Sequence, residues 1–109
     1  MFREYLFLFG YETPAESELN DAAGFDDESS TGLWIAAASE DEAMAWGRIV
    51  AETVVASLFA RAGKSSYSWK EQGFAHWLEK DPVRLSAASS LPRVTAGEFP
   101  AADALTGRL

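Results

Sequence analysis

The sequence predicts a single α+β domain in which a sheet of three or four strands carries one long helix across one face. Three observations predict it. A strand-like aromatic run opens the chain, a long apolar stripe with helix caps occupies its middle, and 48% of the 109 residues are apolar. That content is enough for one core and too little for two. We expect the domain to span residues 1–100 and a polar tail to follow over 101–109.

Two strands are expected in the first third of the chain. Residues 5–11 read Y-L-F-L-F-G-Y, with apolar side chains on both alternating faces. That pattern is typical of a strand covered on both sides, and often of a central one. Residues 32–38 form the second strand, because a turn-like Ser-Ser-Thr precedes a β-branched and aromatic centre.

A short helix over 14–23 can connect these strands. Thr13 and Glu16 match a capping box, with a proline at the first helical position and Gly24 as a stop. The apolar stripe of this segment is thin. An acidic loop over residues 12–30 is therefore the alternative.

The long helix is expected over about residues 40–62. Ser39 and Glu42 match a capping box, and Gly63 supplies a left-handed stop. Apolar residues recur three and four positions apart along this segment. This stripe predicts that Trp46, Val50, Val54 and Leu58 face inward. Gly47 lies inside this helix, where glycine costs about 1 kcal/mol relative to alanine. We expect it to permit close approach of a strand or second helix, with approach of a ligand as the alternative.

The second half of the chain has weaker patterns. Residues 66–70 alternate like a strand, and residues 74–78 have helical spacing in a segment that must end before Pro82. A last strand is expected around residues 93–95.

The charge is unevenly distributed along the chain, whose net charge is -8. Eleven acidic residues and no Lys or Arg lie between positions 4 and 47, whereas eight basic and six acidic residues follow from position 48 onward. Such a surface repels nucleic acids and anionic membranes and attracts basic proteins. We therefore expect a basic protein partner, no nucleic acid and no membrane.

The favoured hypothesis is an acidic protein-binding module. By analogy of character it would be an inhibitor- or immunity-type protein of the cytoplasm, of the kind with which bacteria cap a basic toxin or enzyme. Carboxylates would steer the encounter and aromatic rings would anchor the contact. The expected partner-binding residues are Glu12, Glu16, Asp26, Asp27, Glu28, Trp34, Tyr67 and Trp69.

Two other hypotheses stay open. A small enzyme or ligand-binding protein could use His76 as a base beside an aromatic cluster, with Glu71 or Glu79 as its carboxylate. The second open hypothesis is a structural subunit or homo-oligomer, for example a homodimer. No catalytic residue, metal site or cofactor is expected, because the chain has no cysteine, one histidine and no phosphate loop. The run from Asp26 to Glu28 also lacks the register of a calcium loop.

Overall fold

The fold is an α+β domain with a four-stranded sheet, as the sequence predicts. A computed structural model describes residues 2–24, 27–101 and 104–105. Within these ranges the order is β1 (Arg3–Tyr11), α1 (Pro14–Ala23), β2 (Ser29–Ala37), α2 (Glu40–Arg61), β3 (His76–Glu79), α3 (Pro82–Ala87) and β4 (Arg93–Thr95). The strand order is β3-β1-β2-β4. β1 is antiparallel to β2 and β3, and β2 is parallel to β4.

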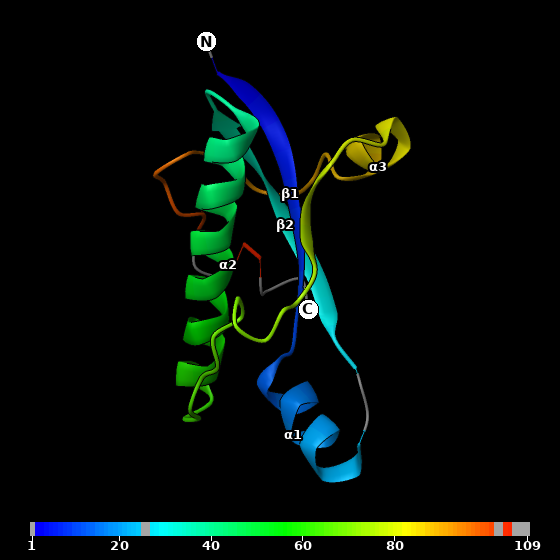
Figure 1. Cartoon of the computed structure of the whole chain (residues 1–109), viewed down its shortest axis with the longest axis vertical. Helices are drawn as coiled ribbons and strands as arrows, with labels where there is room; N and C mark the ends of the chain where they lie inside the picture. Colours follow the sequence, from blue (N-terminus) through cyan, green and yellow to red (C-terminus); the bar gives the residue numbers. More distant parts are fainter. Residues whose placement is uncertain (1, 25–26, 102–103, 106–109) are drawn as a thin grey trace.

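The sheet has two unlike faces. The long helix α2 covers one of them, and α3 lies on the opposite side near the end at which the chain starts (Figure 1). We call the face away from α2 the second face. α1 extends beyond the other end of the sheet, which makes the domain elongated, with extents of 47 × 26 × 24 Å.

The central strand β1 is covered on both faces, as its sequence predicts. Phe7, Phe9 and Tyr11 are fully buried in the core beneath α2. Leu6 points to the second face and is only 1% exposed. Because both sets of side chains leave water, β1 positions everything that pairs with it.

The inward face of α2 differs from the expected one. Val50 is buried, but Trp46, Val54 and Leu58 are half-buried on the flank. The buried positions are Ala43, Gly47, Val50, Ala51, Val55 and Phe59. Small residues lie at the centre because the aromatic side chains of β1 already fill the space beneath the helix.

The caps of the helices follow the sequence closely. Thr13 and Glu16 form both bonds of a capping box, and Gly24 ends α1 in the left-handed conformation at φ 71°. The alternative of an acidic loop over this segment is therefore wrong. Ser39 accepts from the Glu42 amide, while the Glu42 carboxylate accepts from Ala38 rather than closing a box with Ser39.

Two expectations for residues 66–78 are wrong. Residues 66–70 form no strand, because the carboxylate of Glu52 on α2 accepts hydrogen bonds from the Trp69 and Lys70 amides and bends the chain into a turn. Residues 76–79 are the strand β3 instead of a helix, because they pair with the free edge of β1. Pro82 begins α3 behind the Asp81 cap.

Two further features concern the C-terminal segment and the long helix α2. Leu105 is buried in the core, beyond position 100 where we expected the domain to end. By length and composition alone, α2 is long and apolar enough to cross a membrane. Core helices of soluble proteins meet the same criterion, and one side of α2 packs on the sheet.

Candidate functional site: an acidic end

Carboxylates gather at the end of the molecule formed by α1 and its flanking residues. We call this group the acidic end; its members are Glu12, Glu16, Glu18, Asp21, Asp27 and Glu28. A second group, Glu40, Asp41 and Glu42, lies in the first turn of α2. Figure 1 shows that this turn and α1 lie at opposite ends of the molecule. The acidic half of the sequence is thus two separate surfaces.

α1 is held in place by polar contacts. It buries none of its residues, and Leu19 is 52% exposed. The Asn20 side chain donates to the Asp27 carbonyl oxygen at 2.8 Å and accepts from the Asp27 amide at 3.0 Å, and it also donates to the Glu12 carboxylate. Ser29 donates to the Glu16 carboxylate. These bonds fix the short helix against the ends of β1 and β2.

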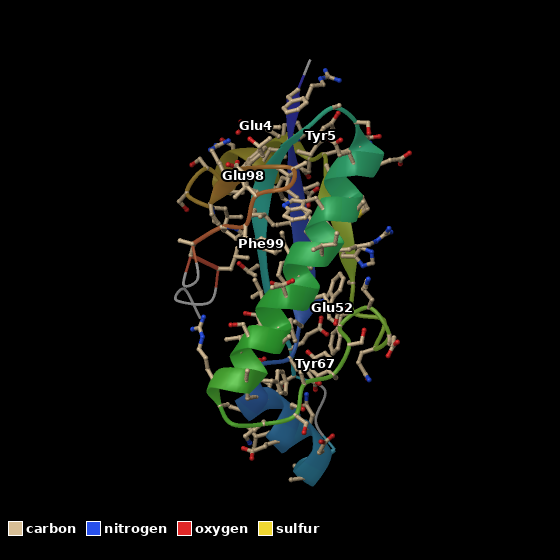
Figure 2. The ribbon with its side chains drawn as sticks, turned by 90° about the vertical axis from the view of Figure 1, so that its left-hand side faces the viewer. Glu4, Tyr5, Glu52, Tyr67, Glu98 and Phe99 are labelled. Carbon is tan, nitrogen blue, oxygen red and sulfur yellow. The ribbon has the colours of Figure 1, made fainter. Side chains whose placement is uncertain are left out.

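Tyr67 ties the acidic end to the loop that follows α2. Its hydroxyl accepts from the Glu12 amide at 2.8 Å and donates to the Glu12 carbonyl oxygen. Figure 2 shows Tyr67 near one end of the domain and Glu4 near the other. Burial, assisted by Glu12, Glu16 and Glu28, raises the pKa of Tyr67 to about 12 against the lowering effect of the Glu12 backbone. The phenol therefore stays neutral in the field of these carboxylates.

Several carboxylates of the acidic end lack a cationic partner. Lys64 pairs with Glu18. Among the described residues, no Lys or Arg lies within ion-pair distance of Asp21, Asp27 or Glu28, which are all exposed. The described part of the chain also holds no group of three His, Asp or Glu that could bind a metal ion. The acidic end therefore presents uncompensated negative charge.

The three aromatic rings expected to anchor a partner have different positions. Trp69 is fully buried against Phe9, and its indole N–H donates to the Gly10 carbonyl oxygen. It therefore forms no part of a surface, and its assignment to the interface was wrong. The sequence alone did not show this, because the partner of its N–H lies on a distant strand.

Trp34 and Tyr67 are both half-buried and both already bonded. The Trp34 indole donates to the Ala88 carbonyl oxygen at 2.9 Å, beneath the Arg93 guanidinium on the second face. Tyr67 contacts the acidic end through the Glu12 backbone, whereas Trp34 lies far along the sheet near α3. Asp26 lies outside the described residues.

In the described part of the chain, no carboxylate bonds to the His76 ring. Its ring packs against Trp69 and Phe7, and its Nε2 accepts from Arg48 Nε at 3.0 Å. Glu79, one expected partner, points to the second face, where it bonds to Trp77. Glu71, the other, forms no hydrogen bond with the imidazole in the described part of the chain. The His–carboxylate pair that a general base would need is thus not formed here.

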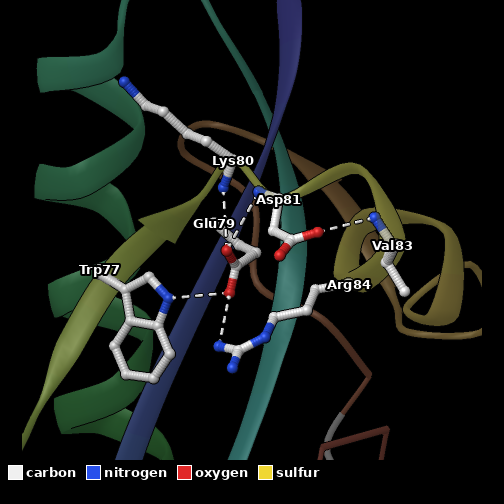
Figure 3. Close-up of polar contacts among 6 residues, drawn as sticks. All are labelled: Trp77, Glu79, Lys80, Asp81, Val83 and Arg84. Carbon is white, nitrogen blue, oxygen red and sulfur yellow. Dashed lines mark hydrogen bonds and ion pairs between the residues drawn. The ribbon is translucent and has the colours of Figure 1, made fainter.

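Glu79 organises the start of α3, a role that sequence reasoning missed. Figure 3 shows its carboxylate accepting from the Trp77 indole, the Lys80 and Asp81 amides and Arg84. The Trp77 bond first, and then the other donors, hold the pKa of Glu79 below its usual value. The Trp77 indole is thereby held on the second face, where it is 37% exposed.

A small pocket opens between α2 and the segment that follows β4. It is lined mainly by apolar atoms, and its lining residues include Val54, Phe99, Pro100 and Arg61. Phe99 packs against Trp46, whose indole donates to the Glu98 carbonyl oxygen, and Figure 2 shows Glu98 and Phe99 beside α2. The pocket carries no described acid–base pair.

No known protein family, curated protein or solved structure matches this chain.

Proposed function

We propose that this chain is an acidic protein-binding module whose acidic end contacts a basic protein. One observation supports this function above the others. Asp21, Asp27 and Glu28 are exposed on a fixed scaffold without a described cationic partner. A basic protein that supplied Lys or Arg there would gain attraction without displacing any internal ion pair.

The fixed scaffold adds to the attraction. Asn20 and the capping box hold the backbone of α1, so a partner would not have to order this segment when it binds. Leu19, on the same helix as Glu16, Glu18 and Asp21, is 52% exposed and offers an apolar contact. Protein interfaces combine apolar contacts of this kind with charged groups nearby.

The inhibitor- or immunity-type role is the finer form of this proposal. A basic toxin or enzyme often recognises anionic substrates through Lys and Arg, and a protein with a fixed acidic surface can occupy the same residues. The two acidic groups at opposite ends of the domain give such a partner a choice of surfaces. In the described part of the chain, five of the six carboxylates at the acidic end have no ion pair, against Asp41 and Glu42 at the other end, and the larger number favours the acidic end.

Amide chemical-shift mapping tests the location. We expect titration of ¹⁵N-labelled protein with a short oligolysine to shift the amides of residues 12–24 and 27–29 most strongly. Salt should remove the effect as the Debye length falls to about 3 Å at 1 M. Shifts spread evenly over both acidic groups would show nonspecific charge attraction and contradict a dedicated surface.

A further inference from the structure

β3 lies at one edge of the sheet, and no strand within residues 2–24, 27–101 and 104–105 pairs with its outer side. Its neighbour is β1, with Trp77 opposite Leu8 and Glu79 opposite Leu6. The Gly10 amide donates to the Ala75 carbonyl oxygen at 2.8 Å, which sets the phase of the hydrogen bonds between these strands. Ala75, Trp77 and Glu79 therefore direct their backbone groups toward β1, because bonded and non-bonded pairs alternate in an antiparallel ladder.

His76 and Leu78 consequently direct their N–H and C=O groups away from the sheet. In the described part of the chain, no hydrogen bond satisfies these backbone groups. The free edge ends at Lys80, since the Glu79 carboxylate accepts from the Lys80 and Asp81 amides. A row of unpaired backbone groups of this kind is a template for another strand.

This edge is complementary to itself. If a second copy lies antiparallel with its Trp77 opposite this Trp77, then His76 of each copy faces Leu78 of the other. Each His76–Leu78 pair can exchange N–H···O bonds in both directions. The two Trp77 residues then form a non-hydrogen-bonded pair, in which side chains lie closest and aromatic rings stabilise pairing. Both indoles are on the second face, where they are now 37% exposed.

The charges beside the edge are also complementary under this symmetry. A groove between α2 and β3 is lined by Glu40, Asp41, Met44, Arg48, Leu78 and Lys80. Arg48 marks the His76 end of the groove through its bond to the imidazole, and Glu40 marks the Lys80 end through its ion pair. A two-fold axis between the two Trp77 residues exchanges these ends, so the Arg48 end of each groove lies beside the Glu40 end of the other.

The net charge of -8 on each copy opposes association, but its arrangement limits the repulsion. α1 follows β1 directly and lies at the Tyr11 end of that strand. Antiparallel packing places the two α1 segments at opposite ends of the pair. They are then more than one Debye length apart, which is about 8 Å at physiological salt. The strongest uncompensated charges therefore stay apart.

We propose that two copies of this chain associate through their β3 edges and form one continuous antiparallel sheet centred on Trp77. The assembly has both α2 helices on one face and an acidic end at each extremity. The four-residue edge is short, so the contact is smaller than that of a permanent dimer and the association is weak and reversible.

Sedimentation of the wild-type protein up to about 1 mM tests the association. We expect a dimer fraction that grows with concentration. Trp77→Lys should abolish it by placing like charges opposite each other, whereas Val83→Lys should not, because Val83 is 76% exposed on α3 away from the edge. Circular dichroism checks that both variants are folded.

A cysteine cross-link tests the register. The chain has no cysteine, so Trp77→Cys introduces a single thiol at the proposed axis. Directly opposed non-hydrogen-bonded residues have the separation a disulfide requires. We expect Trp77→Cys to oxidise to a covalent dimer at least about tenfold faster than Val83→Cys. A chain that stays monomeric, a dimer that Trp77→Lys leaves intact, or equal cross-linking rates would each overturn the proposal.

Discussion

Gly47 on α2 lies directly against the aromatic ring of Phe7 on β1. A Cβ atom at Gly47 would overlap that ring, so the helix approaches the sheet only because residue 47 has no side chain. This confirms that the glycine serves close packing with a strand. The contact sets the distance between α2 and the sheet and, through it, the small-residue centre of the helix.

Replacement of Gly47 by alanine should destabilise the protein although alanine is the better helix former. Alanine gains about 1 kcal/mol of helix propensity. Overpacking against Phe7 costs about 1–3 kcal/mol, and we expect it to dominate. Ala56→Gly, at an exposed position of α2, is the control and should cost about 1 kcal/mol. Urea denaturation measures both, and an increase in stability for Gly47→Ala would mean that the helix lies further from the sheet.

A charge on the inward side of α2 should unfold the domain. Val55 is fully buried, so Val55→Asp places an unpaired carboxylate in the core and should cost more than about 3 kcal/mol. Ile49 is 45% exposed, and Ile49→Asp should melt close to the wild type. Thermal melts followed by circular dichroism compare the two. Equal losses would contradict the assigned face of the helix.

Glu52 should hold the loop that follows α2. Its carboxylate accepts from the Trp69 amide at 2.8 Å and from the Ser68 hydroxyl at 3.1 Å. Glu52→Ala leaves these donors unpaired and should cost about 1–3 kcal/mol, while Glu52→Gln keeps an acceptor and should cost less. Hydrogen exchange at the Trp69 amide is the direct measurement. Unchanged protection in Glu52→Ala would mean that another group holds the turn.

Stability should fall in alkaline solution through the phenols of Tyr11 and Tyr67. Burial first, and nearby carboxylates second, raise the pKa of Tyr11 to about 12, and burial raises that of Tyr67 to about 12 as well. The unfolded chain loses these protons near its ordinary value of 10.0. Full stability is therefore present below pH 10 and is lost progressively between about 10 and 12.

The two phenols should respond differently to removal of the hydroxyl. The Tyr11 hydroxyl is buried without a hydrogen-bond partner among the described residues, so Tyr11→Phe should stabilise the protein by about 1 kcal/mol. Tyr67→Phe removes two bonds to the Glu12 backbone and should destabilise it. Both variants should flatten the alkaline loss. Denaturant titrations at pH 7 and pH 11 separate these effects, and a destabilised Tyr11→Phe would show that its hydroxyl has a partner.

Local signals in the sequence predicted the fold better than signals that depend on distant partners. The caps at Thr13 and Ser39 were correct because each bond joins residues three positions apart. β3 was missed because Phe74, Trp77 and Leu78 also fit a helix, and only pairing with β1 decides between the two. The burial of Trp69 depends on Gly10, fifty-nine positions away.

The candidate site was predicted only in its composition. The run of carboxylates in the first half of the sequence is real, but α2 carries Glu40 and Asp41 to the opposite end from α1. Asn20, which fixes the acidic end, has no signature in the sequence because it acts through Glu12 and Asp27 after the chain has folded.

The association rate with a basic ligand tests the role of the acidic end most directly. Asp27→Asn with Glu28→Gln removes two charges from that end, and Glu40→Gln with Asp41→Asn removes two from the other end. The net charge of the two variants is therefore equal. Stopped-flow mixing with a short oligolysine at low salt should give an association rate reduced at least about fivefold in the first variant and less than about twofold in the second, with little change in dissociation. Equal reductions in both variants would contradict a binding role for the acidic end.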